Sequence, residues 1–249
     1  MNQTIETILS HRSVRKFEDR PLTNEQIKTI VKSAQAASTS SFIQAYSIIG
    51  VKDKDKKKRL AELAGNQPYV EDNGHFFVFC ADFRRHALIG EMEATDVTES
   101  IESTEKFMVA VIDASLAAQN ASVAAESMDL GICYIGGIRT NIQEVAELLG
   151  MPANTIPLFG LAVGYPAQDT AVKPRLPLEH IYHEEVYQQD EQAYKKQLED
   201  YNKEISAYYH ERTKGKRSDT WTSQMAGMLK EPKRKHMKEF VERKGFAKR

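Results

Sequence analysis

The chain has 249 residues, of which 41% are hydrophobic and 28% are charged, and its formal net charge is −1. This length is enough for one large domain, or for one domain with an extension. The balanced charge argues against a nucleic-acid-binding protein and favours a small-molecule partner.

The start of the chain lacks a basic stretch followed by an uninterrupted apolar run, so the sequence predicts neither export nor membrane insertion. Both cysteines, Cys80 and Cys133, lie inside apolar runs. We therefore expect two buried thiols, rather than a disulfide or a metal pair, and a cytoplasmic protein.

The first distinctive segment is His11–Phe17 (HRSVRKF), which gathers three basic residues and a histidine around Ser13. If the preceding apolar-patterned segment continues as a helix, His11 and Arg15 share one face. Arginine suits phosphate because its planar fork of N–H donors makes two parallel, charge-assisted hydrogen bonds. A solvated turn, or the basic C-terminus of a helix, has the same composition, so both interpretations stay open here.

Capping signals and hydrophobic periodicity predict the next elements. They are a helix over 23–37, a hydroxyl-rich loop over 39–41, a strand over 45–51, a helix over 53–64 and a buried strand over 75–82. In the loop before that strand, Gln67 and Tyr69 flank Pro68. They could present an amide and a ring to a ligand, although an ordinary surface turn is the commoner meaning.

The middle of the chain is predicted to form the core of the fold. A long apolar segment over 105–129 indicates a nearly fully buried central helix, followed by a strand over 131–138, a helix over 141–150 and a strand over 156–164. Asp113 lies within the apolar helix and could be a buried acid, although an Asp that bonds locally near a helix start is the commoner explanation, and we expect the latter. Gly136 and Gly137 follow the strand, and they mark either a tight exit turn or a place where a flat ligand approaches the backbone.

After Pro166 the sequence becomes a proline-punctuated loop, and from about Gln189 to the end it predicts polar helices. Lys173 and Arg175 flank Pro174, which favours an extended strip with two cations. Residues 211–249 hold 13 Lys/Arg and 5 Asp/Glu, a local charge of +8, which is most often a solvated face. The element order predicts an α+β fold with a mixed, mainly antiparallel sheet flanked by helices around the central helix, and a helical C-terminal extension.

The sequence contains no metal-ligand spacing, no Gly-x-Gly-x-x-Gly fingerprint and no P-loop. Its motifs together nevertheless resemble the bacterial oxygen-insensitive nitroreductase and NADPH-flavin oxidoreductase family, in the subgroup of major nitroreductase A and flavin reductase P. The resemblance covers nearly the whole chain. It rests on HRSVRKF, the Ser/Thr loop before QAYS, GNQPYV, FVFCADF, AAQNASVAAESMDLGICYIGGIR, PLFGLAVGYP, KPRLP and DTW.

This resemblance implies a homodimer with the nitroreductase-like fold and one non-covalently bound FMN at each subunit boundary. It further implies an FMN-binding core over residues 1–188 and a basic helical extension over residues 189–249 that packs on the core or on the partner subunit. The implied reaction is ping-pong hydride transfer from NAD(P)H, with NADPH preferred, through FMN to free flavin, nitroaromatics or quinones. The resemblance implies no catalytic side chain, no metal, no nucleic acid and no membrane.

The site residues that the resemblance implies fall into four groups. The flavin phosphate and ribityl chain would contact His11, Arg12, Ser13, Arg15, Lys173 and Arg175. The isoalloxazine ring would lie along Ile135, Gly136 and Gly137, and the loops with Thr39, Ser40, Gln67 and Tyr69 would complete the pocket. Arg212 and Arg217 match the basic loop that binds the extra phosphate of NADPH, although Ser218 stands where some relatives have another arginine.

Two other readings of the sequence remain. The same flavin site could serve a quinone, azo or disulfide reductase, since an open pocket accepts many flat molecules. Alternatively, the basic tail could belong to a non-enzymatic protein that binds anions or nucleic acid, which predicts steeply salt-dependent binding.

Overall fold

The computed structural model describes residues 1–249 and divides the chain into two compact units. The first unit comprises residues 1–170 and 234–249, and the second comprises residues 171–233. The predicted division after residue 188 falls inside the second unit, and the last sixteen residues return to the first.

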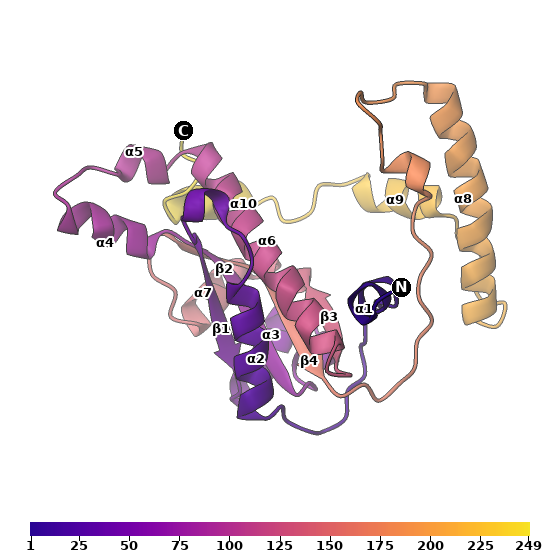
Figure 1. Ribbon diagram of the computed structural model, residues 1–249, viewed down its shortest axis with the longest axis horizontal. Helices are drawn as coiled ribbons and strands as arrows, with labels where there is room; N and C mark the ends of the chain where they lie inside the picture. Colours follow the sequence, from indigo (N-terminus) through magenta and orange to yellow (C-terminus); the bar gives the residue numbers. More distant parts are fainter. The chain divides into compact units, whose positions relative to one another are not determined.

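A four-stranded sheet forms the centre of the first unit (Figure 1). Its strand order is β1-β2-β4-β3, and every neighbouring pair is antiparallel. The strands are β1 (Tyr46–Val51), β2 (His75–Asp82), β3 (Gly131–Ile135) and β4 (Thr155–Gly164). One isolated parallel bridge joins Ser13 to Ile132 of β3. The predicted α+β fold with a mainly antiparallel sheet is confirmed.

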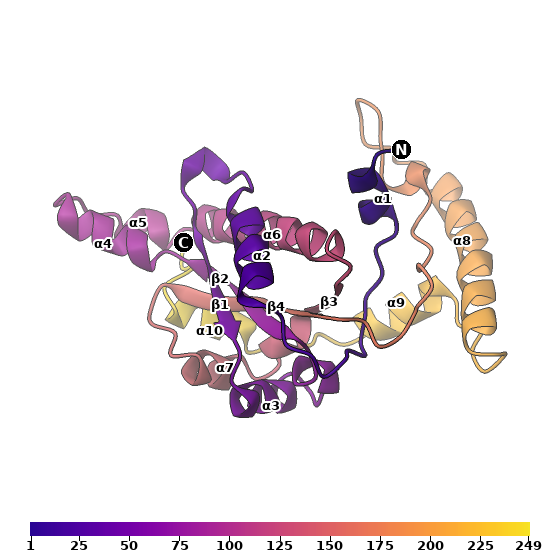
Figure 2. The same ribbon diagram turned by 60° about the horizontal axis from the view of Figure 1, so that its bottom comes forward.

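Helices cover both faces of this sheet (Figure 2). Alternate residues of β2 point to opposite faces, as the two-residue period of a strand requires. Phe77 and Phe79 pack with α2 (Asn24–Gln35) and α6 (Thr104–Glu126), whereas Phe76 and Val78 pack on the side of α3 (Lys54–Leu63) and α7 (Ile142–Leu148). Both faces of β2 are therefore buried, which explains its uninterrupted apolar sequence.

The central helix α6 is less buried than its sequence suggests. Nine of its residues are buried, most of them alanines packed against the sheet. Met108, Ile112 and Leu116, spaced four residues apart, are 45–54% exposed and form an apolar stripe on one face. By length and composition alone α6 could cross a membrane, a property that core helices share.

Two helices of the first unit were absent from the sequence prediction, α4 (Arg84–Met92) and α5 (Thr98–Ile101). Helix α1 (Gln3–Leu9) lies in the apolar-patterned segment before His11, for which a helix was considered only conditionally. The helices α4 and α5 have no side-chain N-cap bond, and the apolar residues Leu88, Ile89 and Met92 of α4 are exposed. Such helices show neither capping signal nor buried stripe in the sequence.

The polar tail contains an apolar anchor that the sequence prediction overlooked. It lies in and just after α10 (Met237–Arg243), where Phe240, Val241 and Phe246 join the core cluster of the first unit. The Phe246 ring lies 5.8 Å from Phe107 and 6.1 Å from Phe83, measured between ring centres. This packing ties the end of the chain to the first unit.

The second unit consists mainly of α8 (Glu191–Arg212) and α9 (Trp221–Leu229). Its small core is the cluster of Tyr201, Ile205 and Tyr209, with Trp221 packed against it. Short 3-10 turns occur in both units, at Ser40–Phe42, Pro68–Val70, Gly136–Arg139 and Leu178–His180.

The buried imidazole of His75 makes the fold sensitive to acid. Burial, together with the charges of Lys52 and Lys57, lowers the pKa of His75 from 6.5 to about 4. Between these values the unfolded chain binds a proton that the folded chain does not, so stability falls as the pH drops from 6.5 towards 4. Urea unfolding at a series of pH values should show this loss, and it should shrink in His75→Gln. The exposed His210→Gln serves as the control, and an unchanged acid loss in His75→Gln would contradict the assignment.

Candidate functional site

The segment from His11 to Phe17 is extended rather than helical, because α1 ends at Leu9. The amide of Val14 donates to the Ile132 carbonyl of β3 at 2.9 Å, and Phe17 pairs with Pro166. His11 and Arg15 would share a helix face only if the helix continued past Leu9, and it does not. Since side chains two residues apart share one side of an extended segment, Ser13 and Arg15 lie opposite the buried Val14.

Two basic side chains of this segment already have acidic neighbours. His11 Nδ1 lies 2.7 Å from Glu126 Oε1 at the end of α6, and an Arg12 Nη lies 3.4 Å from Asp169 Oδ1. Arg12 Nε is buried and has no hydrogen-bond partner. Glu126 positions the His11 ring, and the orphaned Nε leaves Arg12 with a donor available to a further acceptor.

Four predicted site residues come together next to β3. The Arg15 guanidinium carbon lies 6.0 Å from the centre of the Tyr69 ring. The Tyr69 hydroxyl donates to Gln67 Oε1 at 2.5 Å, and the Gln67 amide donates to the Ala64 carbonyl at 2.6 Å. A Cβ placed on Gly137 would overlap this same Gln67 amide and Ala64 carbonyl. Arg15, Tyr69, Gln67 and Gly137 thus form one connected cluster.

The paired glycines follow directly on the end of β3. The strand ends at Ile135, and Gly136 and Gly137 begin a 3-10 turn. The side chain of Ile135 is buried, so a ligand at this position would contact its backbone rather than its side chain. Gly136 is less crowded than Gly137, because a Cβ there would meet only the tip of the Arg139 side chain, at 3.2 Å.

Both thiols are free and buried, as the sequence predicts. Burial raises the pKa of Cys80 and of Cys133, and the nearby Arg15 guanidinium partly offsets the rise at Cys133. Neither thiol is thus activated as a nucleophile. No group of three or more His, Cys, Asp or Glu side chains is arranged to hold a metal ion.

The loop that carries Thr39 and Ser40 is held by Asp113. Asp113 accepts hydrogen bonds from the amides of Ser40 and Ala45, each at 3.0 Å. The expectation of a local bond within α6 is wrong, because this carboxylate reaches backbone donors 68 and 73 residues away along the chain. No hydrogen bond joins Thr39 or Ser40 to the cluster around Arg15.

In the second unit, two predicted cations meet at Tyr209. Lys173 Nζ donates to the Tyr209 hydroxyl at 2.9 Å, and the Arg217 guanidinium carbon lies 4.5 Å from the centre of its ring. The hydrogen bond from Lys173 lowers the pKa of Tyr209, with a further contribution from the charge of Arg217. Tyr209 was missed at the sequence level, although Tyr201, Ile205 and Tyr209 recur at the four-residue spacing of a buried helix face.

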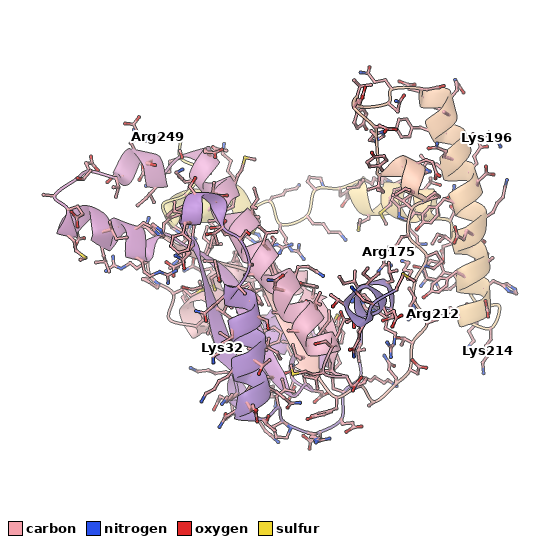
Figure 3. All side chains as sticks on the ribbon, viewed as in Figure 1. Lys32, Arg175, Lys196, Arg212, Lys214 and Arg249 are labelled. Atoms are coloured by element: carbon pink, nitrogen blue, oxygen red, sulfur yellow. The ribbon has the colours of Figure 1, made fainter.

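The other two predicted site residues of this unit, Arg175 and Arg212, make separate contacts. Arg175 donates to the Lys173 carbonyl at 2.9 Å, and Arg212 donates to the Tyr208 hydroxyl at 2.7 Å. Figure 3 labels Arg212 and Lys214 at the C-terminal end of α8, with Arg175 on the loop. Arg217 is also paired with Asp219 at 2.7 Å.

Comparison with known proteins identifies the family. The profile of the nitroreductase family matches residues 8–165, and that of the nitroreductase family C-terminal domain matches residues 173–249. The chain belongs to the nitroreductase family. The resemblance inferred from the motifs is therefore confirmed, and the chain is an oxidoreductase of this family.

Named members of the nitroreductase family are similar to the chain over its full length. The FMN reductase (NADPH) of Bacillus subtilis is 56% identical over 248 residues, covering 100% of both chains. The structure of Bacillus megaterium NfrA1 matches with a TM-score of 0.98 and 67% identity, over 99% of this chain and 100% of that one. The NADPH:FMN oxidoreductase of Vibrio harveyi, solved in complex with NAD+, matches with a TM-score of 0.90 and 43% identity, over 100% of both chains.

The crowding at Gly137 gives a test of the cluster next to β3. Gly137→Ala should destabilise the protein by about 1–3 kcal/mol, because the new methyl group overlaps backbone and side-chain atoms of the neighbouring loop. Gly136→Ala is the matched control and should cost less, since its Cβ would stand 3.2 Å from an Arg139 Nη and would overlap no backbone atom. Urea denaturation of the flavin-free variants measures both effects, and equal stability of the two variants would argue against the close approach.

Proposed function

We propose that the chain is an NADPH-dependent FMN reductase of the nitroreductase family, with nitroaromatics and quinones as further acceptors. The observation that carries the proposal is the cluster of Arg15, Tyr69, Gln67 and Gly137 at the end of β3. It combines a cation, polar groups and side-chain-free backbone, which are the features that a flat anionic cofactor requires. The names of the similar proteins from B. subtilis and V. harveyi support the same activity.

Family membership implies a flavin cofactor, and the residues of the first unit fit FMN. The donor set is cationic, Arg12 Nε is buried without a partner, and the glycine pair leaves the backbone at the end of β3 without side chains. We assign the phosphate and ribityl end to His11, Arg12, Ser13 and Arg15, together with Lys173 and Arg175. The ring is assigned to Ile135, Gly136 and Gly137, with Thr39, Ser40, Gln67 and Tyr69 completing the site.

Bound FMN would supply the hydride chemistry, and the side chains would bind and orient it. Because His11 Nδ1 lies beside Glu126, its Nε2 is the nitrogen left for a ligand. Arg15 adds positive charge, which favours the accumulation of electrons on a nearby ring. No side chain of the cluster is assigned as a general acid or base.

The second unit is proposed to bind the nicotinamide nucleotide. Arg212 lies at the end of α8, and Arg217 lies in the segment that follows. Their guanidinium groups suit the extra phosphate that distinguishes NADPH from NADH. Lys173, which is assigned to FMN, contacts the same Tyr209 as Arg217. Within this proposal, residues 1–188 carry the flavin site and residues 189–249 form the basic extension.

We further propose a homodimer. The apolar stripe of Met108, Ile112 and Leu116 on α6 is unpartnered within the first unit, and Ile5 and Ile8 of α1 are exposed as well. Exposed apolar groups at regular spacing are typical of an interface between subunits. Two free thiols agree with a reducing compartment, and we propose the cytoplasm.

The ion pairs of the tail weaken the case for the nucleic-acid alternative. Lys248 and Arg249 both contact Glu102, and Arg243 contacts Glu239. These cations are partly neutralised by their own chain, which favours the interpretation of the tail as a solvated face.

The visible spectrum tests the proposed activity. The purified protein should be yellow, NADPH should bleach it, and an added acceptor should restore the colour. Arg15→Ala and Lys173→Ala should each weaken FMN binding about tenfold or more, because each removes a charge-assisted hydrogen bond to the cofactor. Arg59→Ala and Lys195→Ala, which remove exposed ion-paired cations, are the controls. A colourless wild-type protein that does not take up FMN would refute the proposal.

Nucleotide preference tests the assignment of Arg217. Arg217→Ala should raise the KM for NADPH about tenfold and leave the KM for NADH nearly unchanged, since only NADPH carries the extra phosphate. Steady-state kinetics with both nucleotides, again with Arg59→Ala as control, measure this difference. Equal changes in the two KM values would mean that Arg217 does not contact that phosphate.

A further inference from the structure

The loop from Thr39 to Ala45 has an unusual backbone. Ser41, Phe42 and Gln44 have φ values of +48°, +59° and +54°, in the left-handed region that residues other than glycine rarely occupy. Phe42, at the tip, is 81% exposed, so packing of its ring does not hold the loop in place. Two turn hydrogen bonds, from Phe42 to Thr39 and from Ile43 to Ser40, lie within the loop, so the contacts that fix its position in the fold come from outside it.

Asp113 supplies the buried part of these contacts. Its Oδ1 accepts from the Ser40 amide and its Oδ2 from the Ala45 amide, so a single carboxylate holds both ends of the loop. Asp113 is fully buried in α6 and makes no salt bridge. A buried carboxylate needs strong donors, and these two amides are the hydrogen-bond donors that it has.

Helix α4 contacts the carbonyl groups of the same loop. Arg85 donates to the carbonyls of Gln44 and Tyr46, at 3.2 and 2.7 Å, and His86 Nε2 lies 2.7 Å from the Ile43 carbonyl. Arg85 is half exposed, whereas Asp113 is closed off from solvent. Asp113 is therefore the anchor least weakened by competition with water.

We propose that Asp113 is a positioning residue for flavin binding, which holds the Thr39–Ala45 loop in the left-handed form that presents Thr39 and Ser40 to the cofactor. This inference rests on the proposed function, because it takes Thr39 and Ser40 as cofactor contacts. It assigns a functional reason to a charged residue in the middle of an apolar helix. Asparagine would not replace it, since an amide has one acceptor oxygen and would turn its NH2 group towards one of the two N–H donors.

The test compares wild-type protein with Asp113→Asn, and with Asp55→Asn as an exposed control for the same chemical change. Backbone amide hydrogen exchange reports on the loop, fluorescence titration with FMN gives the Kd, and thermal unfolding of the flavin-free protein gives stability. In Asp113→Asn we expect exchange at Ser40 and Ala45 to be about tenfold faster, and FMN binding about tenfold weaker, as the loss of a charged hydrogen bond implies. Exchange in β2 and β4 should stay unchanged.

A second variant approaches the loop from its exposed side, in case Asp113→Asn does not fold. Gln44→Val puts a β-branched residue at a positive φ, which opposes the left-handed form without touching Asp113 or the core. It should also speed exchange in the loop and weaken FMN binding.

The outcomes separate this inference from the proposed function. If the wild-type protein binds FMN, and either variant loosens the loop without weakening FMN, the positioning role is wrong while the proposed function stands. Unchanged exchange at Ser40 and Ala45 in Asp113→Asn also overturns it. If the wild-type protein does not bind FMN, both proposals fail together.

Discussion

The candidate site depends on the pairing of the N-terminal segment with β3. The hydrogen bond from Val14 to Ile132 turns residues that follow a short helix into an extended strip along the sheet. Val14 is buried against Gly131, where a Cβ would lie 2.7 Å from one of its methyl groups. This fit leaves no room for a side chain at position 131, and it fixes the position of Arg15 relative to the end of the strand.

Polar side chains on helices then hold predicted binding residues within each unit. Glu126 contacts His11, Asp113 holds the loop of Thr39 and Ser40, and Tyr209 contacts Lys173 in the second unit. Each is far in sequence from the residue it contacts. In each pair the predicted binding residue is partly exposed, and the buried or half-buried partner determines its position.

The sequence predicts the parts of the fold that have a local signal. The capping signal that predicts the helix over 23–37 forms as a capping box of Thr23 and Gln26, and the apolar run of β2 is buried on both faces. Helix α4 was missed because its apolar residues are exposed. The conformation of His11–Arg15 stayed open because it is set by a partner strand more than a hundred residues away. The role of Asp113 could not be predicted for the same reason, since both of its donors come from another element.

The glycines and cations of the site could be predicted from the sequence because their residue types suit a flavin, and this prediction does not depend on their long-range contacts. Family resemblance supplied their roles, and geometry now connects four of them, from Arg15 through Tyr69 and Gln67 to Gly137. A crystal structure of the protein with FMN bound would test the assigned flavin site most directly. The account predicts the flavin ring along Gly136 and Gly137 with the phosphate at the His11–Arg15 strip. A flavin bound elsewhere, with this strip contacting only protein, would contradict it.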